Sequence, residues 1–379
     1  MSRGRRGAET SESASRADIV AALAAAPGSS RLDLAKRIGL GAATVTAQVR
    51  RLVELGYVRE LPAVAGGTGR PKVPLEVVHG AGAILGVAIA VDHLLLVATG
   101  LDGVSVAQSR VPFDPAAPGA MDVIADACTA LRQGLEAPLL GVGVALSGVV
   151  DEASGLVAVS VVLGWRRVEL GPQLAAKLGL PVHVENDLRA LATRELYVSA
   201  RPAPDDFLLF VCGSGVGMAL VRNRVVVAGM HGTSTEFGHV SIDPSGPRCR
   251  CGNFGCPQAY LGAAELRDVL AGALGWRPDD LAAVVGEPSV RAHLARVGAL
   301  LGRAVGGAAT LLGISDLRLT GETLAVWDAL EPTFRVSLEQ ASTTLLSPPS
   351  VVVVPWDEEA TAIGASSTAM ARILAARLT

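Results

Sequence analysis

One histidine and three cysteines, two thirds of the way along this 379-residue chain, have the types and spacing of metal ligands. His239 precedes Cys249, Cys251 and Cys256, which fall within eight positions of one another. One imidazole and three thiolates can enclose Zn²⁺ tetrahedrally, and four protein ligands leave no position for a reactive water. The pattern therefore predicts a structural zinc knuckle, with three buried thiols and an unrelated histidine as the alternative.

The residues around these ligands resemble the signature of a known family. Glu236, Phe237 and Gly238 precede His239, and the cysteines follow in a Cys-x-Cys-Gly-x-x-Gly-Cys pattern. The combination resembles the ROK family (repressors, open reading frames and sugar kinases), over a stretch from about Arg16 to the C-terminus. The resemblance implies an α/β fold with two actin-like, ribonuclease-H-like lobes around a cleft, in which the zinc knuckle supports a monosaccharide site.

The resemblance also implies sugar contacts. Asn186 and Asp187 match the family's Asn-Asp pair, whose aspartate is the general base in the kinases, and Glu236 matches a glutamate that binds ring hydroxyls. His239 can bind zinc through one ring nitrogen and present the other to a sugar. These groups offer the directional donors and acceptors that a polyol requires. Simple capping of the following helix by Asn186 and Asp187 is the alternative.

Two further positions bear on the sugar site. Gly148 corresponds to a family glycine near the sugar, where close approach of the backbone excludes a Cβ atom. Gln258 stands where the family usually has a glutamate ligand, so an NH2 donor replaces an anionic oxygen. This exchange predicts a weaker sugar site, or one adapted to other hydroxyl patterns. A regulator that no longer binds sugar is the extreme case.

The phosphate-binding motifs of the family's kinases are incomplete in this chain. Where the kinases have an Asp-x-Gly-x-Thr loop, Ala88 replaces the carboxylate, and Ala90 and Val91 replace glycines. The glycine turn over residues 213–217 remains, but Leu-Thr-Gly-Glu at 319–322 replaces the adenosine-side Gly-Gly motif. Phosphoryl transfer needs phosphate loops and a carboxylate for Mg²⁺. We therefore predict no catalytic residues, with a divergent sugar kinase as the alternative.

Composition divides the chain into three parts. Residues 1–15 are polar and are expected to form a disordered tail. Residues 1–80 carry 12 Lys and Arg against 7 Asp and Glu, while the remainder is acidic. We predict a basic winged helix-turn-helix domain over residues 16–79 and the two-lobed sugar-binding domain over residues 80–379.

The basic domain has the element pattern of a winged helix-turn-helix. Helices are expected from Arg16, over Arg31–Ile38 and over Ala42–Leu55, and strands near residues 57–61 and 73–78 flank a glycine-rich wing. Gly41 stands where related helices often have a Ser or Thr cap, so the third helix is expected to lack one.

Polar and basic side chains of this domain suit operator DNA. The predicted contacts are Thr44, Thr46, Gln48 and Arg51 on the exposed face of the third helix, and Arg70 and Lys72 in the wing. Narrow minor grooves attract such wing cations. A winged helix that binds protein is the alternative.

The rest of the chain alternates strands and helices, which favours α/β lobes. Hairpins are predicted over residues 84–101 and 207–227 and a buried strand over 139–146, with helices near 121–135, 186–198, 290–312 and 361–378. Asp92 and His93 interrupt the most apolar window, so no membrane span is expected. Thiol ligands suit a reducing cytoplasm.

These observations predict a sugar-responsive transcriptional regulator, most simply a repressor of carbohydrate uptake or catabolism genes. It is expected to bind palindromic double-stranded operator DNA as a homodimer or homotetramer. A sugar effector that bridges Asn186, Asp187, Glu236 and His239 would close the cleft and change the spacing of two DNA-binding heads. The last helix resembles one that packs beside the linker in the family and offers a route for this signal.

Overall fold

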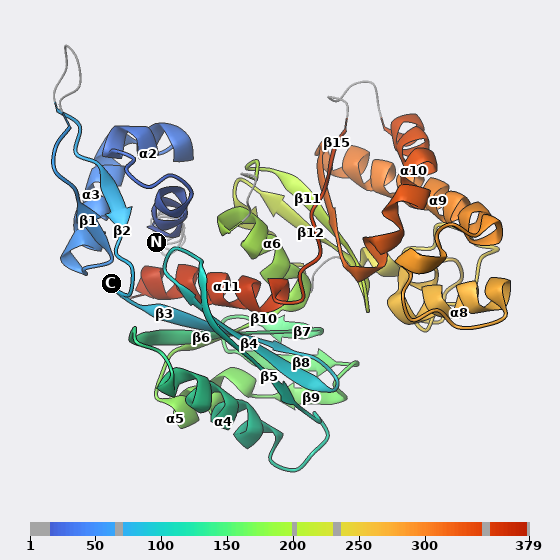
Figure 1. The fold of residues 1–379 in the computed structure, drawn as a ribbon, viewed down its shortest axis with the longest axis horizontal. Coiled ribbons are helices and arrows are strands. Elements are labelled where there is room, and N and C mark those ends of the chain that lie inside the picture. Colours follow the sequence, from blue (N-terminus) through green and yellow to red (C-terminus); the bar gives the residue numbers. More distant parts are fainter. Residues whose placement is uncertain (1–15, 65–70, 199–202, 230–235, 343–348, 377–379) are drawn as a thin grey trace, which may run out of the picture. The chain divides into compact units, whose positions relative to one another are not determined.

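The computed structural model describes residues 16–64, 71–198, 203–229, 236–342 and 349–376 (Figure 1). The chain divides into two compact units. Unit 1 combines Met1–Pro202 with Glu359–Thr379, and unit 2 is Ala203–Glu358. Among the described residues, no helix combines the length and the apolar character needed to cross a membrane.

Unit 1 begins with a small domain that we call the head. It contains a helix over residues 16–25, α2 (Arg31–Ile38), α3 (Ala42–Glu54) and an antiparallel pair of strands, β1 (Val58–Glu60) and β2 (Leu75–Val77). A capping box between Ser30 and Asp33 starts α2, whereas α3 starts at Gly41 without a side-chain cap, as the sequence predicted. The three helices and the strand pair confirm the predicted head elements.

A mixed sheet forms the centre of unit 1, in the strand order β10-β6-β3-β4-β5. Its strands are β3 (Ala83–Ile89), β4 (His93–Gly100), β5 (Ser105–Pro112), β6 (Leu139–Leu146) and β10 (Val182–Asn186). One face packs against α4 (Ala120–Gln133) and α5 (Leu170–Leu178), and the other against α6 (Asp187–Tyr197) and α11 (Ala360–Ala376) (Figure 1). A smaller antiparallel sheet joins β7 (Val149–Asp151), β8 (Leu156–Ser160) and β9 (Trp165–Val168).

Helix α11 lies directly on the backbone of the central strands. Gly86 on β3 and Gly143 on β6 are register partners. A Cβ atom at Gly86 would lie 1.8 Å from the carbonyl oxygen of Ala362, and one at Gly143 would lie 1.9 Å from that of Ala365. Because no side chain fits at either position, glycine is what allows this close approach of helix and sheet.

The head shares a hydrophobic core with α11 and the sheet. Leu23, Val49 and Leu52 of the head belong to one buried cluster with Met370 and Ile373 of α11. The strand residues Ile84 and Leu140 complete the cluster. Contiguous burial of this kind fixes the head on the end of α11.

Unit 2 contains a second mixed sheet, in the order β13-β12-β11-β14-β15. Its strands are β11 (Phe207–Cys212), β12 (Val216–Arg222), β13 (Val225–Val226), β14 (Asp316–Thr320) and β15 (Ser350–Val353). The helices are α7 (Pro257–Leu261), α8 (Ala263–Leu274), α9 (Pro288–Leu312) and α10 (Trp327–Ala341), with 3-10 turns η2 (Phe237–His239), η3 (Ala282–Val284) and η4 (Glu322–Val326). Their apolar faces pack with β11 and β14 into one core.

Candidate functional sites

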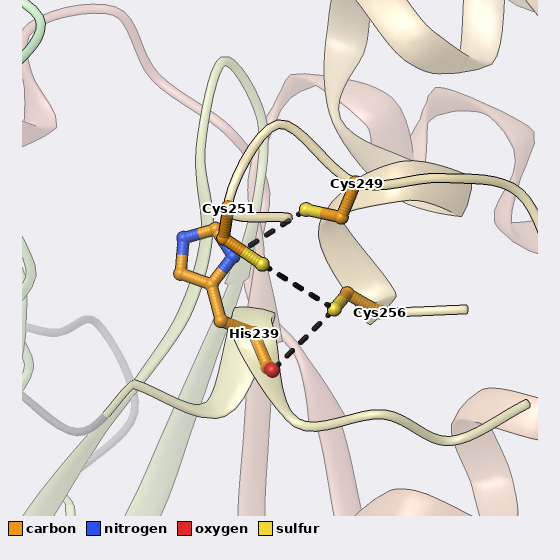
Figure 2. A group of neighbouring side chains, drawn as sticks. All are labelled: His239, Cys249, Cys251 and Cys256. Carbon is orange, nitrogen blue, oxygen red and sulfur yellow. Dashed lines mark hydrogen bonds between the residues drawn. The ribbon is translucent and has the colours of Figure 1, made fainter. Parts of the chain in front are cut away.

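The four predicted metal ligands gather at one point of unit 2. The ligand atoms of His239, Cys249, Cys251 and Cys256 all lie within 4.8 Å of one another (Figure 2). The Cys251 and Cys256 sulfurs are 3.8 Å apart, and Nδ1 of His239 is 3.6 Å from the Cys249 sulfur. Tetrahedral zinc with bonds of about 2.3 Å separates its thiolate ligands by about 3.7 Å. The cluster can therefore hold one metal ion, as the sequence predicted.

Backbone hydrogen bonds hold the loop that carries the cysteines, and one position in this loop requires glycine. The backbone N–H of Cys249 donates to the carbonyl of Asn253 over 2.8 Å. Gly255 has φ +61°, and a Cβ atom there would lie 1.7 Å from the carbonyl oxygen of Asp243. The Asp243 carboxylate accepts hydrogen bonds from Tyr260 and Arg296, and the first of these helps to lower the pKa of Asp243 to about 2. An ionised Asp243 thus anchors the loop on α7 and α9.

His239 lies in η2 and has one ring nitrogen that faces away from the thiols. Its Nδ1 is directed at Cys249, and the other ring nitrogen lies on the far side of the ring (Figure 2). Glu236 immediately precedes η2 and is exposed, and its carbonyl accepts from the backbone N–H of His239 over 3.0 Å. The structure thus places both predicted sugar ligands on one short turn beside the cluster.

Gln258 is buried, and both the oxygen and the nitrogen of its side-chain amide form hydrogen bonds within the protein. Its Oε1 atom accepts from the backbone N–H of Val216 over 2.8 Å. Its Nε2 atom donates to the carbonyl of Ser214 and to the carboxylate of Glu265, over 3.4 and 3.3 Å. Gln258 therefore ties the cysteine loop to the glycine turn between β11 and β12. A sugar contact for Gln258 stays a prediction.

In unit 1 the predicted residues Asn186, Asp187 and Gly148 also come together. The Asn186 side-chain oxygen accepts from the backbone N–H groups of Leu188 and Arg189. The alternative prediction, that Asn186 caps the following helix, is therefore confirmed for this oxygen. The Asn186 amide nitrogen donates to the carbonyl of Gly148 over 3.0 Å. A single side chain thus starts α6 and holds the Gly148 turn.

Asp187 occupies the first position of α6 in an environment that disfavours its charge. Burial raises the pKa of its carboxyl group to about 6, although the backbone N–H of Leu188 partly opposes this shift. A carboxyl group whose pKa lies near neutral pH, at the N-terminus of a helix, is suited to accept hydrogen bonds from a polar ligand. A sugar contact for Asp187 stays a prediction, as it does for Asn186 and Gly148.

Sequence reasoning missed a cluster of charged residues next to Asn186. Arg189 forms ion pairs with Glu185, over 3.0 Å, and with Glu152, over 2.8 Å. Glu152 also pairs with Arg372 of α11 over 2.6 Å. Burial raises the pKa of Glu185 to about 7, against the lowering influence of Arg189. Because Glu185 lies on β10 and Arg189 in the first turn of α6, helical spacing could not have predicted their pairing.

The predicted DNA-contacting residues of α3 are only partly on its exposed face. Thr44, Thr46 and Arg51 are exposed, in agreement with the prediction. The predicted placement of Gln48 on the exposed face was wrong, because Gln48 is only 9% exposed and its Oε1 accepts from Nε of Arg16 over 2.5 Å. Position 48 lies one turn from Val45 and Leu52, so helical periodicity places it on the buried stripe.

The exposed face of α3 also carries Arg50, which the sequence reasoning did not single out. Its side chain is 76% exposed, and it lines a surface hollow together with Ala42, Ala43, Thr46 and Ala47. In the wing, Lys72 pairs with Val64 in a β-bridge and its ammonium is 3.4 Å from Asp33. Arg70 lies outside the described residues.

Comparisons with known proteins identify both parts of the chain. Residues 84–372 match the ROK family, and residues 14–59 match a winged helix-turn-helix DNA-binding family. The xylose repressor of Bacillus subtilis (strain 168) is 29% identical over 241 residues, which cover 62% of each chain. The chain thus spans somewhat less than two thirds of the length of this curated relative.

Two other similarities complete the comparison. A glucokinase of Thermotoga maritima is 33% identical over 148 residues, or 39% of this chain and 46% of the kinase. A crystal structure described as a ROK family transcriptional regulator, homolog of the E. coli MLC protein, superposes with a TM-score of 0.79 at 22% identity and covers 97% of both chains. At that identity the superposition establishes the fold alone, an α/β domain behind a winged helix-turn-helix head.

Proposed function

Because the chain belongs to the ROK family, we propose that it is a sugar-responsive, DNA-binding transcriptional repressor. The observation that carries the proposal is that unit 1 contains both the winged head and three of the predicted sugar contacts, Gly148, Asn186 and Asp187. The head shares its core with α11, and α11 packs on the sheet that ends at Asn186. The xylose repressor relative supports a sugar as the effector.

DNA is bound through α3 and the wing in this proposal. Thr44, Thr46, Arg50 and Arg51 present hydroxyl and guanidinium groups at exposed positions of α3. Thr46 and Arg50 share a surface hollow with Ala42, Ala43 and Ala47. Such a helix fits the major groove, and a second copy of the chain would supply the other half-site of a palindromic operator. The assembly is a homodimer or a homotetramer.

The groups that bind the sugar in this proposal are Asn186, Asp187, Gly148, Glu236, His239 and Gln258. A bound sugar shifts the protein between two states by the difference between its affinities for those states, and by no more than that.

We assign Zn²⁺ to the cluster of His239 and the three cysteines. Three thiols and one imidazole form a closed ligand set of the structural type. Zinc bound there would hold the cysteine loop between η2 and α7 against His239 of η2, and through Gln258 it would steady the glycine turn. The chemistry that zinc supplies is structural, and the polar groups around the sugar do the recognition.

A sugar kinase is the second candidate, because of the similarity to the Thermotoga maritima glucokinase. Two features of this chain oppose it. Ala88 offers no carboxylate for Mg²⁺, and Glu322 places its Cγ atom 3.7 Å from the position of a Cβ atom at Gly213, in the retained glycine turn. An acidic group there repels phosphate. We expect no ATP-dependent phosphorylation of glucose or xylose in a coupled assay, and sustained turnover would favour the kinase.

The proposal is tested by selecting duplexes from a random pool with the full-length, zinc-loaded protein. Fluorescence anisotropy on the selected duplex then gives its Kd with and without D-xylose, D-glucose and N-acetylglucosamine. A palindromic selected sequence and a sugar-dependent change in Kd are expected. Failure to enrich any sequence would exclude the repressor, whereas enrichment without a sugar effect would leave a regulator of another ligand class.

A further inference from the structure

A buried arginine clamps the recognition helix to the end of α11. Arg16 is only 8% exposed, and its guanidinium bonds to residues of both α3 and α11. Its Nε donates to the side chain of Gln48 on α3, and its Nη1 donates to the carbonyls of Leu374 and Ala375 over 2.9 and 3.1 Å. These carbonyls belong to the last turn of α11, where the helix itself provides no donor partners and where positive charge is favoured.

The last turns of α11 also contact the charged cluster beside Asn186. Arg372 is two residues before Leu374, and its guanidinium is 2.6 Å from the Glu152 carboxylate. Glu152 is shared with Arg189, which also faces Glu185. The Glu185 carboxylate in turn accepts from the backbone N–H of Asn186 over 2.8 Å.

Together with the backbone of the last turns of α11, these interactions form a path through unit 1. It runs from the Gly148 carbonyl through Asn186 to the ion pairs, along the last turns of α11, and through one guanidinium to α3.

We propose that Arg16 and Arg372 are positioning residues that couple the Asn186 cap to the orientation of α3. The inference rests on the proposed function and names the residues that transmit its signal. A ligand that draws the Asn186 amide away from Gly148 displaces the start of α6 and, with it, the guanidinium of Arg189. Glu152 then moves with its partner Arg189, and Arg372 moves with its partner Glu152. The resulting shift of the last turn of α11 moves Arg16 and, with it, the hydrogen bond to Gln48 of α3.

The chain offers a matched control for Arg372. Arg335 pairs with Glu331 on α10 at the same 2.6 Å distance, and the side chains of Arg372 and Arg335 are 43% and 48% exposed, with equally exposed partners. Arg335 lies in unit 2 and has no part in the path. Comparison of Arg372→Gln with Arg335→Gln thus separates removal of this path from removal of any ion pair of this kind.

The test measures amide hydrogen exchange of α3 in the full-length protein without ligand. Asn186→Ala is introduced into three backgrounds, namely the natural sequence, Arg372→Gln and Arg335→Gln. Since coupling networks carry modest energies, we expect Asn186→Ala to speed exchange of α3 about tenfold in the natural and Arg335→Gln backgrounds. In the Arg372→Gln background the same change should have less than about a twofold effect, because the path is already cut.

Two outcomes would overturn the coupling. One is an equal effect of Asn186→Ala in all three backgrounds, and the other is no effect on α3 in the natural background. Arg16→Lys, which keeps the charge but not the forked geometry, should behave as Arg372→Gln does. These measurements require no sugar and no operator. The proposed function can therefore fail in the binding assay while the coupling stands, and the reverse also holds.

Discussion

Asp187 holds a carboxylate where the protein environment disfavours its charge. Burial raises the pKa of Asp187 to about 6 from its ordinary value of 3.8. A raised pKa stabilises the folded state through the protonated form, fully at pH values below the unfolded pKa, and this stability is lost as the pH rises through 6. Folding at neutral pH thus proceeds in spite of Asp187, which is common for groups kept for binding.

Asp187→Asn should therefore stabilise the protein at pH 7.5. We expect the free energy of unfolding to rise by about 3 kcal/mol there, since each pKa unit corresponds to about 1.4 kcal/mol. The gain should shrink towards zero at pH 4, and sugar binding should be lost. Urea denaturation at both pH values measures the first effect and calorimetric titration with sugar the second. An equal gain at both pH values would mean that the charge of Asp187 is not its cause.

Cys251 is the exposed member of the metal cluster, which makes it the safest ligand to replace. Cys251→Ser should lower bound zinc from about one ion per chain to a small fraction, because a hydroxyl is a poor substitute for thiolate. Elemental analysis after dialysis measures the metal. Cys128→Ser, at a buried thiol on α4, is the control and should retain the ion. Full zinc occupancy in Cys251→Ser would remove this residue from the ligand set.

At the scale of elements, α11 is the piece on which unit 1 depends. It packs on Gly86 and Gly143 with no room for a Cβ atom, and its far end carries the core residues shared with the head. A change beneath this helix should therefore be felt by sheet and head together.

Gly86→Ala tests this dependence. The added Cβ atom must displace the Ala362 carbonyl, so we expect the free energy of unfolding to fall by about 3 kcal/mol or more. Gly272→Ala is the control, because Gly272 lies within α8 and an added Cβ atom would meet no neighbour. That control should be stabilised by up to about 1 kcal/mol. Equal stability of both variants would show that α11 can shift freely on the sheet.

The same elements show which parts of the structure could be predicted from the sequence. The helix over Ala42–Glu54, the β3–β4 hairpin and the cysteine cluster follow from local periodicity and spacing, which neighbouring residues determine. Gln48 was misassigned because polarity was weighed above its place on the buried stripe. Its partner Arg16 lies 32 residues away, and Glu152 and Arg372 lie 220 apart. Contacts of that separation leave no local pattern, so the path through unit 1 was invisible before the structure.

At the scale of the whole molecule, a basic head precedes an otherwise acidic chain, and the proposed DNA binding assigns the basic residues of the head to the phosphates. Arg50 has a side chain that is 76% exposed on α3. Arg50→Ala should weaken binding to the selected duplex and lower the salt dependence of log Kd by about one unit if its guanidinium neutralises one phosphate. Lys177→Ala, on α5 of the same unit, is the control. An unchanged salt slope would exclude a phosphate contact for Arg50.

The place of α11 in the chain has a consequence for synthesis. The head and the strands of the first sheet leave the ribosome early, but all of unit 2 is translated before α11. Until then, Leu52 and Ile84 face water where Met370 and Ile373 belong. A nascent chain therefore carries a head without its supporting helix, exposed to chaperones and proteases in that interval. A messenger RNA that ends within the codons of unit 2 therefore yields the same unsupported head, even though α3 is complete.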